Sequence, residues 1–235
     1  MQFNPHHLSN LRALKGDRQG WVGQRLASYL ASVLGDSELI ESSILTDNES
    51  DRDYIFKLVQ NNAVSTQICC VAIFGWGGMR RDNARECIQA SRRWLSIAEA
   101  IRSNKLSRSK AYSDFLSLRN SKSLPGMGPA FFTKIIYFLG VENVSRGYIL
   151  DQWTARSANL LLGKSLIHLT RVNNAAWVSD RNSEVVYEEF CQFIERLGYE
   201  LGVSADLAEE IIFSAGNKGR KQTRGAWRDY VLRHG

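Results

Sequence analysis

The chain of 235 residues is long enough to form one large domain or two small lobes around a core of its own. Its hydrophobic fraction of 44% is typical of a globular protein, and no apolar run reaches the roughly 18 residues that a membrane span needs. The first residues lack the apolar core and the cleavage site of a secretory signal. We therefore expect a cytoplasmic protein that contacts no membrane.

The formal net charge of +6 is distributed unevenly along the chain. Residues 80–122 carry eleven basic and four acidic side chains, and residues 218–235 carry six basic and one acidic. Residues 36–53 reverse this balance with one basic and seven acidic, and residues 184–210 with one and eight. Such segregation favours a basic face that binds nucleic acid, although each run alone is typical of a solvated helix surface.

Four cysteines stand at positions 69, 70, 87 and 191, with no paired CxxC spacing. A zinc or iron–sulfur site would need closer clustering of its ligands. We interpret all four as reduced thiols of the core, and we expect neither a metal nor another cofactor.

Helical periodicity is visible along most of the chain, and alternating strand patterns are scarce. The expected helices are 20–36, 51–63, 65–78, 81–104, 108–120, 129–140, 151–165, 183–202, 204–217 and 226–234. No linker rich in Pro, Gly or Ser interrupts them. The sequence therefore predicts an all-α fold in which residues 1–235 form a single compact domain of two lobes.

The segment "SLPGMGPAFFTKIIYFLG", residues 123–140, reads as a tight turn followed by an apolar helix. Together with the preceding helix it predicts a helix-turn-helix corner over about 111–140. Gly126 and Gly128 remove side chains where the turn is sharp or touches a ligand, and Pro129 suits a first helical turn. Free amides at this helix start, with the helix dipole behind them, would form a seat for a phosphate.

"LPGMGPAFFTKIIYFLG" followed by "YILDQWTARSANLLLG" resembles the signature of the helix-hairpin-helix DNA glycosylases, the superfamily that includes 8-oxoguanine, adenine-mismatch and 3-methyladenine glycosylases. "ILDQWTAR" is most similar to the adenine glycosylase version, which has an Arg five residues beyond the Asp. The resemblance covers residues 124–162, and a weaker one begins upstream at "FGWGGMRRDNARECIQA". It implies a two-lobed helical fold, an active site in the cleft between the lobes, and a monomer that acts on double-stranded DNA.

Asp151 matches the catalytic carboxylate of that superfamily. Cleavage of an N-glycosidic bond builds positive charge on the sugar, which a nearby carboxylate stabilises while it orients the attacking water. An Asp before "QWTAR" is also a good helix N-cap, so the residue type alone favours a structural role, whereas its position 23 residues after Gly128 favours catalysis. The two roles can coexist on one side chain.

The sequence departs from the strand-cutting glycosylases at Ala130, where those relatives carry their nucleophilic Lys. Lys134 lies one helical turn later on the same face. We expect it to be a solvated surface residue and the enzyme to be monofunctional, with Lys134 as the alternative nucleophile for strand cleavage.

The resemblance also assigns residues to contacts with DNA and with the flipped base. Trp76, Gln152 and Trp153 are candidates for the base pocket, because a flipped base needs stacking partners and polar groups at its edge. Met79, Arg80, Arg81 and Asn83 are candidates to fill the hole left in the duplex, and the alternative is that they are simply the first turn of a charged helix. The expected DNA contacts are Gly126, Met127, Gly128, Arg80, Arg81 and Asn83.

The sequence therefore predicts a DNA glycosylase that flips and excises a base and leaves an abasic site. Its substrate would be either an oxidised purine such as 8-oxoguanine, in repair, or a hypermodified phage base, in antiviral defence. The alternative is a non-catalytic DNA-binding module that uses the hairpin only for sequence-independent contact, which would have no need of Asp151. No RNA-recognition motif supports an RNA-directed protein.

Overall fold

The computed structural model describes residues 1–14, 21–35, 50–140, 146–173, 175–214 and 225–235. The chain forms two compact units. The first comprises residues 1–21 and 148–235, and the second comprises residues 22–147. The expected basic tail around 218–224 lies outside the described residues.

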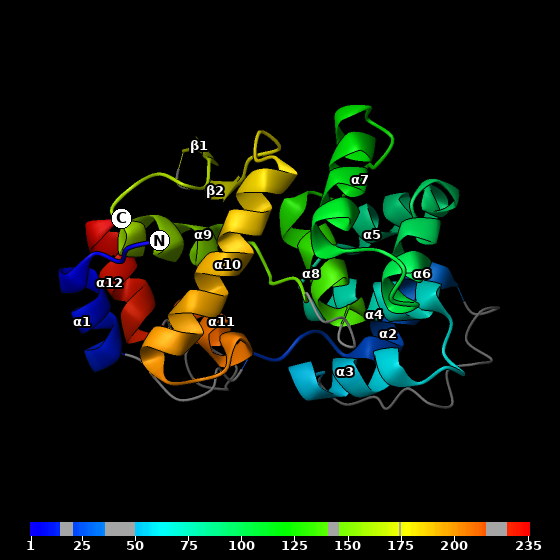
Figure 1. Ribbon diagram of the computed structural model, residues 1–235. Coiled ribbons are helices and arrows are strands. Elements are labelled where there is room, and N and C mark those ends of the chain that lie inside the picture. Colours follow the sequence, from blue (N-terminus) through cyan, green and yellow to red (C-terminus); the bar gives the residue numbers. More distant parts are fainter. Residues whose placement is uncertain (15–20, 36–49, 141–145, 174, 215–224) are drawn as a thin grey trace. The chain divides into compact units, whose positions relative to one another are not determined.

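The second unit is entirely helical over its described residues (Figure 1). Its helices are α2 (Leu26–Leu34), α3 (Arg52–Gln60), α4 (Thr66–Trp76), α5 (Arg81–Gln89), α6 (Leu95–Arg102), α7 (Arg108–Asn120) and α8 (Pro129–Leu139), with a 3-10 turn at Ser91–Arg93.

The first unit contains five helices and a two-stranded sheet among its described residues (Figure 1). The elements are α1 (Pro5–Leu14), α9 (Gln152–Leu162), β1 (Leu169–Val172), β2 (Ala175–Val178), α10 (Glu184–Leu201), α11 (Ala205–Phe213) and α12 (Ala226–His234). The predicted all-α class is confirmed.

Helix α4 is the central element of the second unit. Every residue from Ile68 to Trp76 is buried, and α2, α3, α6 and α8 all pack on the helix. The Ser65 hydroxyl accepts a hydrogen bond from the Ile68 amide, and the helix ends at Gly77, as the sequence predicts. The apolar run "TQICCVAIFGW" is therefore a helix that is enclosed on all sides.

Two expected helices have different bounds in the structure. The helix predicted from residue 20 begins only at Leu26, and the long helix predicted over 81–104 is broken into α5, the 3-10 turn and α6. Trp94 accounts for the break, because its side chain is fully buried and its indole Nε1 donates to the Cys87 carbonyl at 2.9 Å. Burial of this indole in the core outweighs the helical preference of the surrounding sequence.

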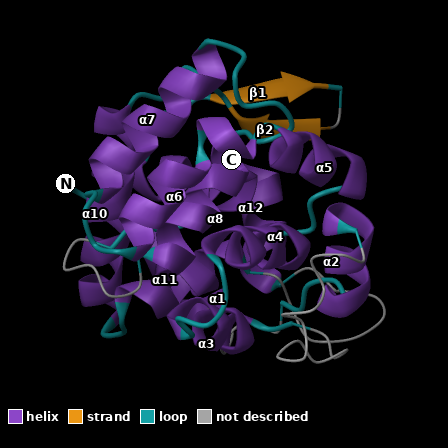
Figure 2. Ribbon diagram, turned by 90° about the vertical axis from the view of Figure 1, so that its right-hand side faces the viewer, coloured by secondary structure: helices purple, strands orange, loops and turns teal. Residues whose placement is uncertain are grey.

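The β1–β2 hairpin and helix α1 were not predicted. The two strands pair antiparallel with Leu169 opposite Val178 and Val172 opposite Ala175, and Figure 2 shows them as a short hairpin. Asn173 adopts a left-handed φ of 52° at the turn. Strands of four residues are too short for their alternation to stand out in the sequence.

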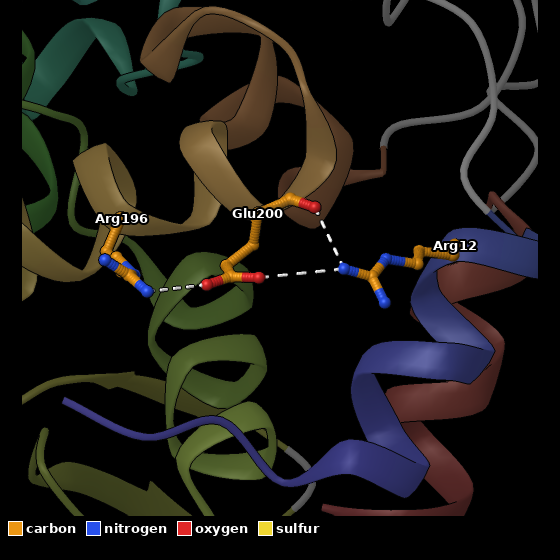
Figure 3. Close-up of polar contacts among 3 residues, drawn as sticks. All are labelled: Arg12, Arg196 and Glu200. Atoms are coloured by element: carbon orange, nitrogen blue, oxygen red, sulfur yellow. Dashed lines mark hydrogen bonds and ion pairs between the residues drawn. The ribbon is translucent and has the colours of Figure 1, made fainter.

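Within the first unit, two arginines from different helices converge on one carboxylate (Figure 3). Arg196 pairs with Glu200 along α10 at 2.9 Å, and Arg12 of α1 reaches the other carboxylate oxygen at 3.7 Å. Arg12 also donates to the Glu200 backbone carbonyl at 3.0 Å. These contacts bind the N-terminal helix to α10.

All four cysteines are free and buried, as the sequence predicts. Burial raises the pKa of the Cys69 thiol to about 11 and that of the Cys87 thiol to about 12. Over the described part of the chain, no helix has the length and apolar character needed to cross a bilayer.

Candidate functional site

The turn between α7 and α8 is formed by Pro125 and Gly126. Gly126 has φ of 69°, and a Cβ at this position would lie 2.7 Å from the backbone oxygen of Asn83. The Cys87 thiol donates to the Pro125 carbonyl at 3.0 Å. Gly126 is therefore required by a sharp turn that packs on α5, and Asn83, an expected DNA contact, lies directly against it.

Gly128, the N-cap of α8, has a different environment. Its φ of −97° suits any residue, and a Cβ built on it would meet nothing within 4 Å. Pro129 occupies the first helical position, as predicted. The amides of Gly128 and Ala130 donate to no other described residue, so they are available at the positive end of the α8 dipole. Met127 is buried and anchors the turn.

Lys134 is buried, so the expectation of a solvated surface residue is wrong. Its Nζ donates to the Ala130 carbonyl at 2.7 Å and lies 5.2 Å from the centre of the Phe131 ring. The aliphatic stem packs against Gly77 at the end of α4, where an added Cβ would come within 2.8 Å of Lys134 Cδ. Gly77 thus leaves the space that the lysine stem occupies.

Residues 76–81, from the end of α4 to the start of α5, include both buried and exposed side chains. Trp76 is buried and makes an edge contact with Phe138 at 4.8 Å between ring centres. Met79 is only 1% exposed, so its expected role as a wedge does not match its position in the core. Arg80 and Arg81 are exposed at the start of α5, and Arg80 forms an ion pair with Asp82.

Two arginines that sequence reasoning missed lie on Tyr137 in the same unit. The Arg52 guanidinium is 4.9 Å from the ring centre and donates to the Tyr137 hydroxyl at 2.7 Å. The Arg146 guanidinium is 4.3 Å from the same ring and 4.6 Å from Phe56. Arg52 also lies 5.5 Å from the Trp76 ring, so a cationic and aromatic cluster adjoins the candidate pocket residue. No local motif marks it, because its members are distant in sequence.

Asp151 of the first unit is the N-cap of α9, as its alternative interpretation predicts. Its Oδ1 accepts from the Trp153 amide at 2.7 Å and from the Thr154 amide at 3.0 Å. The Thr154 hydroxyl accepts in return from the Asp151 amide at 3.0 Å, which completes a capping box. Oδ2 has no partner among the described residues and retains contact with solvent. One oxygen therefore fixes the side chain, and the other makes no hydrogen bond with a described residue.

Gln152 and Trp153 follow Asp151 in the first turn of α9, and both are partly exposed. The Trp153 ring is in contact with cations, because the Arg228 guanidinium of α12 lies 4.4 Å from its centre and that of Arg156 lies 5.5 Å away. The indole of this pocket candidate therefore packs within its own unit. Arg228 was not predicted, since it comes from a helix 75 residues further along the chain.

The basic run at 80–122 is partly internal. Arg102 donates to the backbone carbonyls of Val59, Val64 and Asn61, and Arg108 donates to that of Arg146. Arg119 reaches the Leu124 carbonyl. The remaining basic residues of the run are exposed: Arg80, Arg81, Arg85, Arg92, Arg93, Lys105, Lys110 and Lys122.

The helical fold, the glycine hairpin and the capped aspartate define a protein of the helix-hairpin-helix glycosylase class. A family model described as "Putative 8-oxoguanine DNA glycosylase OGG-like protein" matches residues 12–213. The chain belongs to this family, as a divergent member of the superfamily that its hairpin resembles. Searches of curated proteins and of solved structures found no match. Membership indicates a DNA glycosylase that binds DNA.

Proposed function

We propose that the protein hydrolyses the N-glycosidic bond of a damaged or modified nucleotide in double-stranded DNA and leaves an abasic site. The observation that carries this proposal is that the two carboxylate oxygens of Asp151 have different surroundings. Its Oδ1 is held by two backbone amides, while Oδ2 faces no described partner. A pure DNA-binding module would need only the cap, which Asn or Ser provides as well as Asp.

The capped carboxylate suits the chemistry of base release. Positive charge develops on the sugar as the base departs, and a preorganised negative charge stabilises it without reorientation during the reaction. The capping box holds the side chain in one position at the positive end of the α9 dipole. The same Oδ2 can orient a water molecule toward the anomeric carbon and accept its proton.

The hairpin corner supplies the contact with the duplex. The open space around Gly128 and the available amides of Gly128 and Ala130 fit a backbone phosphate, which needs donors but carries no base information. Arg80 and Arg81 extend this contact from the start of α5. Gln152 and Trp153, which follow Asp151 in the first turn of α9 and are partly exposed, are proposed to border the flipped base.

Two substrate classes remain candidates, an oxidised purine in repair and a hypermodified base in phage DNA. The family name favours 8-oxoguanine. The experiment is incubation of the protein with a panel of duplexes that carry 8-oxoguanine, adenine opposite 8-oxoguanine, an alkylated purine, or the modified bases of a phage genome. Free base is identified by mass spectrometry, and abasic sites are scored in parallel. Duplex binding without base release from any of them would favour the non-catalytic alternative.

A further inference from the structure

Arg156 of α9 and Arg228 of α12 lie on the ring of Trp153 of α9, and Arg171 of β1 acts electrostatically on Arg156; we call these four residues the Arg156 cluster. Figure 1 shows α9 between the β1–β2 hairpin and α12, and α9 packs on both β2 and α12. The two guanidiniums on Trp153 lie 5.5 Å and 4.4 Å from its ring centre. The family resemblance makes Trp153 a candidate for the base pocket and includes Arg156 in its motif, but it assigns no role to Arg156, Arg171 or Arg228.

The two cations on Trp153 differ in their partners. Arg228 donates from Nε and Nη2 to the Phe213 carbonyl at 3.1 and 2.6 Å, so it caps the C-terminus of α11. Arg156 makes no hydrogen bond or ion pair with any described residue. Its Nε is buried, while its terminal nitrogens keep contact with solvent. A guanidinium held in this way presents its terminal donors outward.

Two other arginines of the same unit have the carboxylate partner that Arg156 lacks. Arg12 and Arg196 both pair with Glu200, which balances their charge (Figure 3). No described carboxylate takes that place for Arg156. Its buried Nε lacks an acceptor, and apart from the Trp153 ring its charge has no described partner, so a bound anion would stabilise it.

Arg171 adds a second positive charge beside Arg156. It stands opposite Ala176 in the sheet, on the strand face that carries buried Ala176 and Val178. Since β2 packs on α9, this face is turned toward that helix. Burial and the charge of Arg171 together lower the pKa of the Arg156 guanidinium. A shared anion would stabilise both charged side chains.

We infer that Arg156 and Arg171 bind a backbone phosphate of the DNA strand that contains the excised nucleotide. The inference rests on the proposed function and extends it with a contact that lies wholly within the unit of Asp151. A guanidinium matches two phosphate oxygens at once, and a phosphodiester is the anion that a DNA substrate provides. Arg156 is five residues beyond Asp151, about 7.5 Å along the helix axis, so this phosphate lies within a few nucleotides of the reacting sugar.

The first test measures the salt dependence of binding to an undamaged duplex, which requires no base release. Loss of one phosphate contact lowers the slope of log affinity against log salt by about 0.9. Because the two arginines share one phosphate, we expect a decrease of up to this size for Arg156→Gln and for Arg171→Gln, and little change for Arg156→Lys, which keeps the charge. Arg196→Gln is the matched control, because it removes a charge that Glu200 already balances. Arg171 is exposed, so its variant tests the inference even where Arg156→Gln unfolds.

The second test replaces single phosphates near the target nucleotide with neutral methylphosphonates. We expect one position at which the replacement weakens binding several-fold in the wild type and has no further effect in Arg156→Gln. Equal losses in both proteins at every position, or unchanged salt slopes in both folded variants, would overturn the inference. Inorganic phosphate that stabilises the wild type at constant ionic strength, without these effects on DNA, would show a site for free phosphate instead and also overturn it. A wild type that binds no duplex would overturn the proposed function as well.

Discussion

Lys134 lies one helical turn beyond Ala130, the position of the expected nucleophile, and it is buried in the interior of its unit. Its stem fills the space left by Gly77, and its ammonium is bound to the Ala130 carbonyl. In this position the lysine stabilises α8 and the end of α4. Strand cleavage would require it to leave its carbonyl partner and to lose a proton before it attacks the sugar.

We therefore expect borohydride added during turnover to trap no protein–DNA adduct. Lys134→Met retains the packing against Gly77 and removes the amine, so base excision in this variant remains within a few-fold of the wild type. The measurement is a denaturing gel for adducts beside a single-turnover assay for base release. An adduct that forms in the wild type and disappears in Lys134→Met would establish strand cleavage through this lysine.

Residues whose role depends on neighbours in the chain were predictable. Asp151 as an N-cap, Ser65 as a cap and Pro129 at the first helical position all follow from side chains that bond to amides two or three residues away. The burial of Lys134 and the stacking of Arg228 on Trp153 were not predictable. Both depend on contacts between helices that only the folded chain brings together.

At the scale of elements, Gly126 and Gly128 of the hairpin corner differ in conformation and surroundings, although the sequence predicts the same role for both. Gly126 has a left-handed φ and touches the Asn83 backbone, whereas Gly128 is extended and faces open space. Strain and steric overlap at Gly126 cost stability, while a methyl group at Gly128 affects only what approaches its amide.

Gly128→Ala should therefore leave the free energy of unfolding within about 0.5 kcal/mol and weaken duplex binding, whatever the base. Gly126→Ala should destabilise the protein by about 1–2 kcal/mol. Chemical denaturation and fluorescence titration with an undamaged duplex give both quantities for each variant. Unchanged affinity in a folded Gly128→Ala would contradict the phosphate seat at the hairpin.

The bounds of elements were predictable where a cap or a glycine marks the end. Helices α4, α8 and α9 begin close to where the sequence places them. The break between α5 and α6 was missed, because it depends on the burial of Trp94 and on its bond to the Cys87 carbonyl. The β1–β2 hairpin was missed because each strand is only four residues long.

At the scale of the whole molecule, the basic run predicted from the sequence contributes to DNA binding only through those of its side chains that are exposed. Of the eleven basic residues at 80–122, Arg102, Arg108 and Arg119 are not exposed and donate to backbone carbonyls of their own unit, and the exposed Arg85 also donates to the Ser32 carbonyl. The other members of the run are exposed. Internal cations stabilise the fold and release no counterions when DNA binds.

Duplex affinity should fall steeply with salt, and the double change Arg92→Gln with Arg93→Gln should lower the slope by up to about 1.8. Arg102→Gln should leave the slope unchanged and reduce stability, because it leaves the carbonyls of Val59, Val64 and Asn61 without their donor. Titrations at several salt concentrations measure the slopes. An affinity that does not depend on salt would contradict the basic face.

The central claim is that Asp151 both caps α9 and performs the chemistry, and a pair of substitutions separates the two roles. Asn caps a helix about as well as Asp, whereas Ala costs about 1 kcal/mol of stability. Single-turnover base release is measured for the wild type, Asp151→Asn and Asp151→Ala on the substrate that the duplex panel identifies, with duplex affinity and thermal stability alongside. We predict that Asp151→Asn keeps its affinity and stability but releases base about a hundred-fold more slowly or worse, since it lacks the carboxylate charge. Base release at the wild-type rate in Asp151→Asn, or equal loss of binding and excision, would contradict the account.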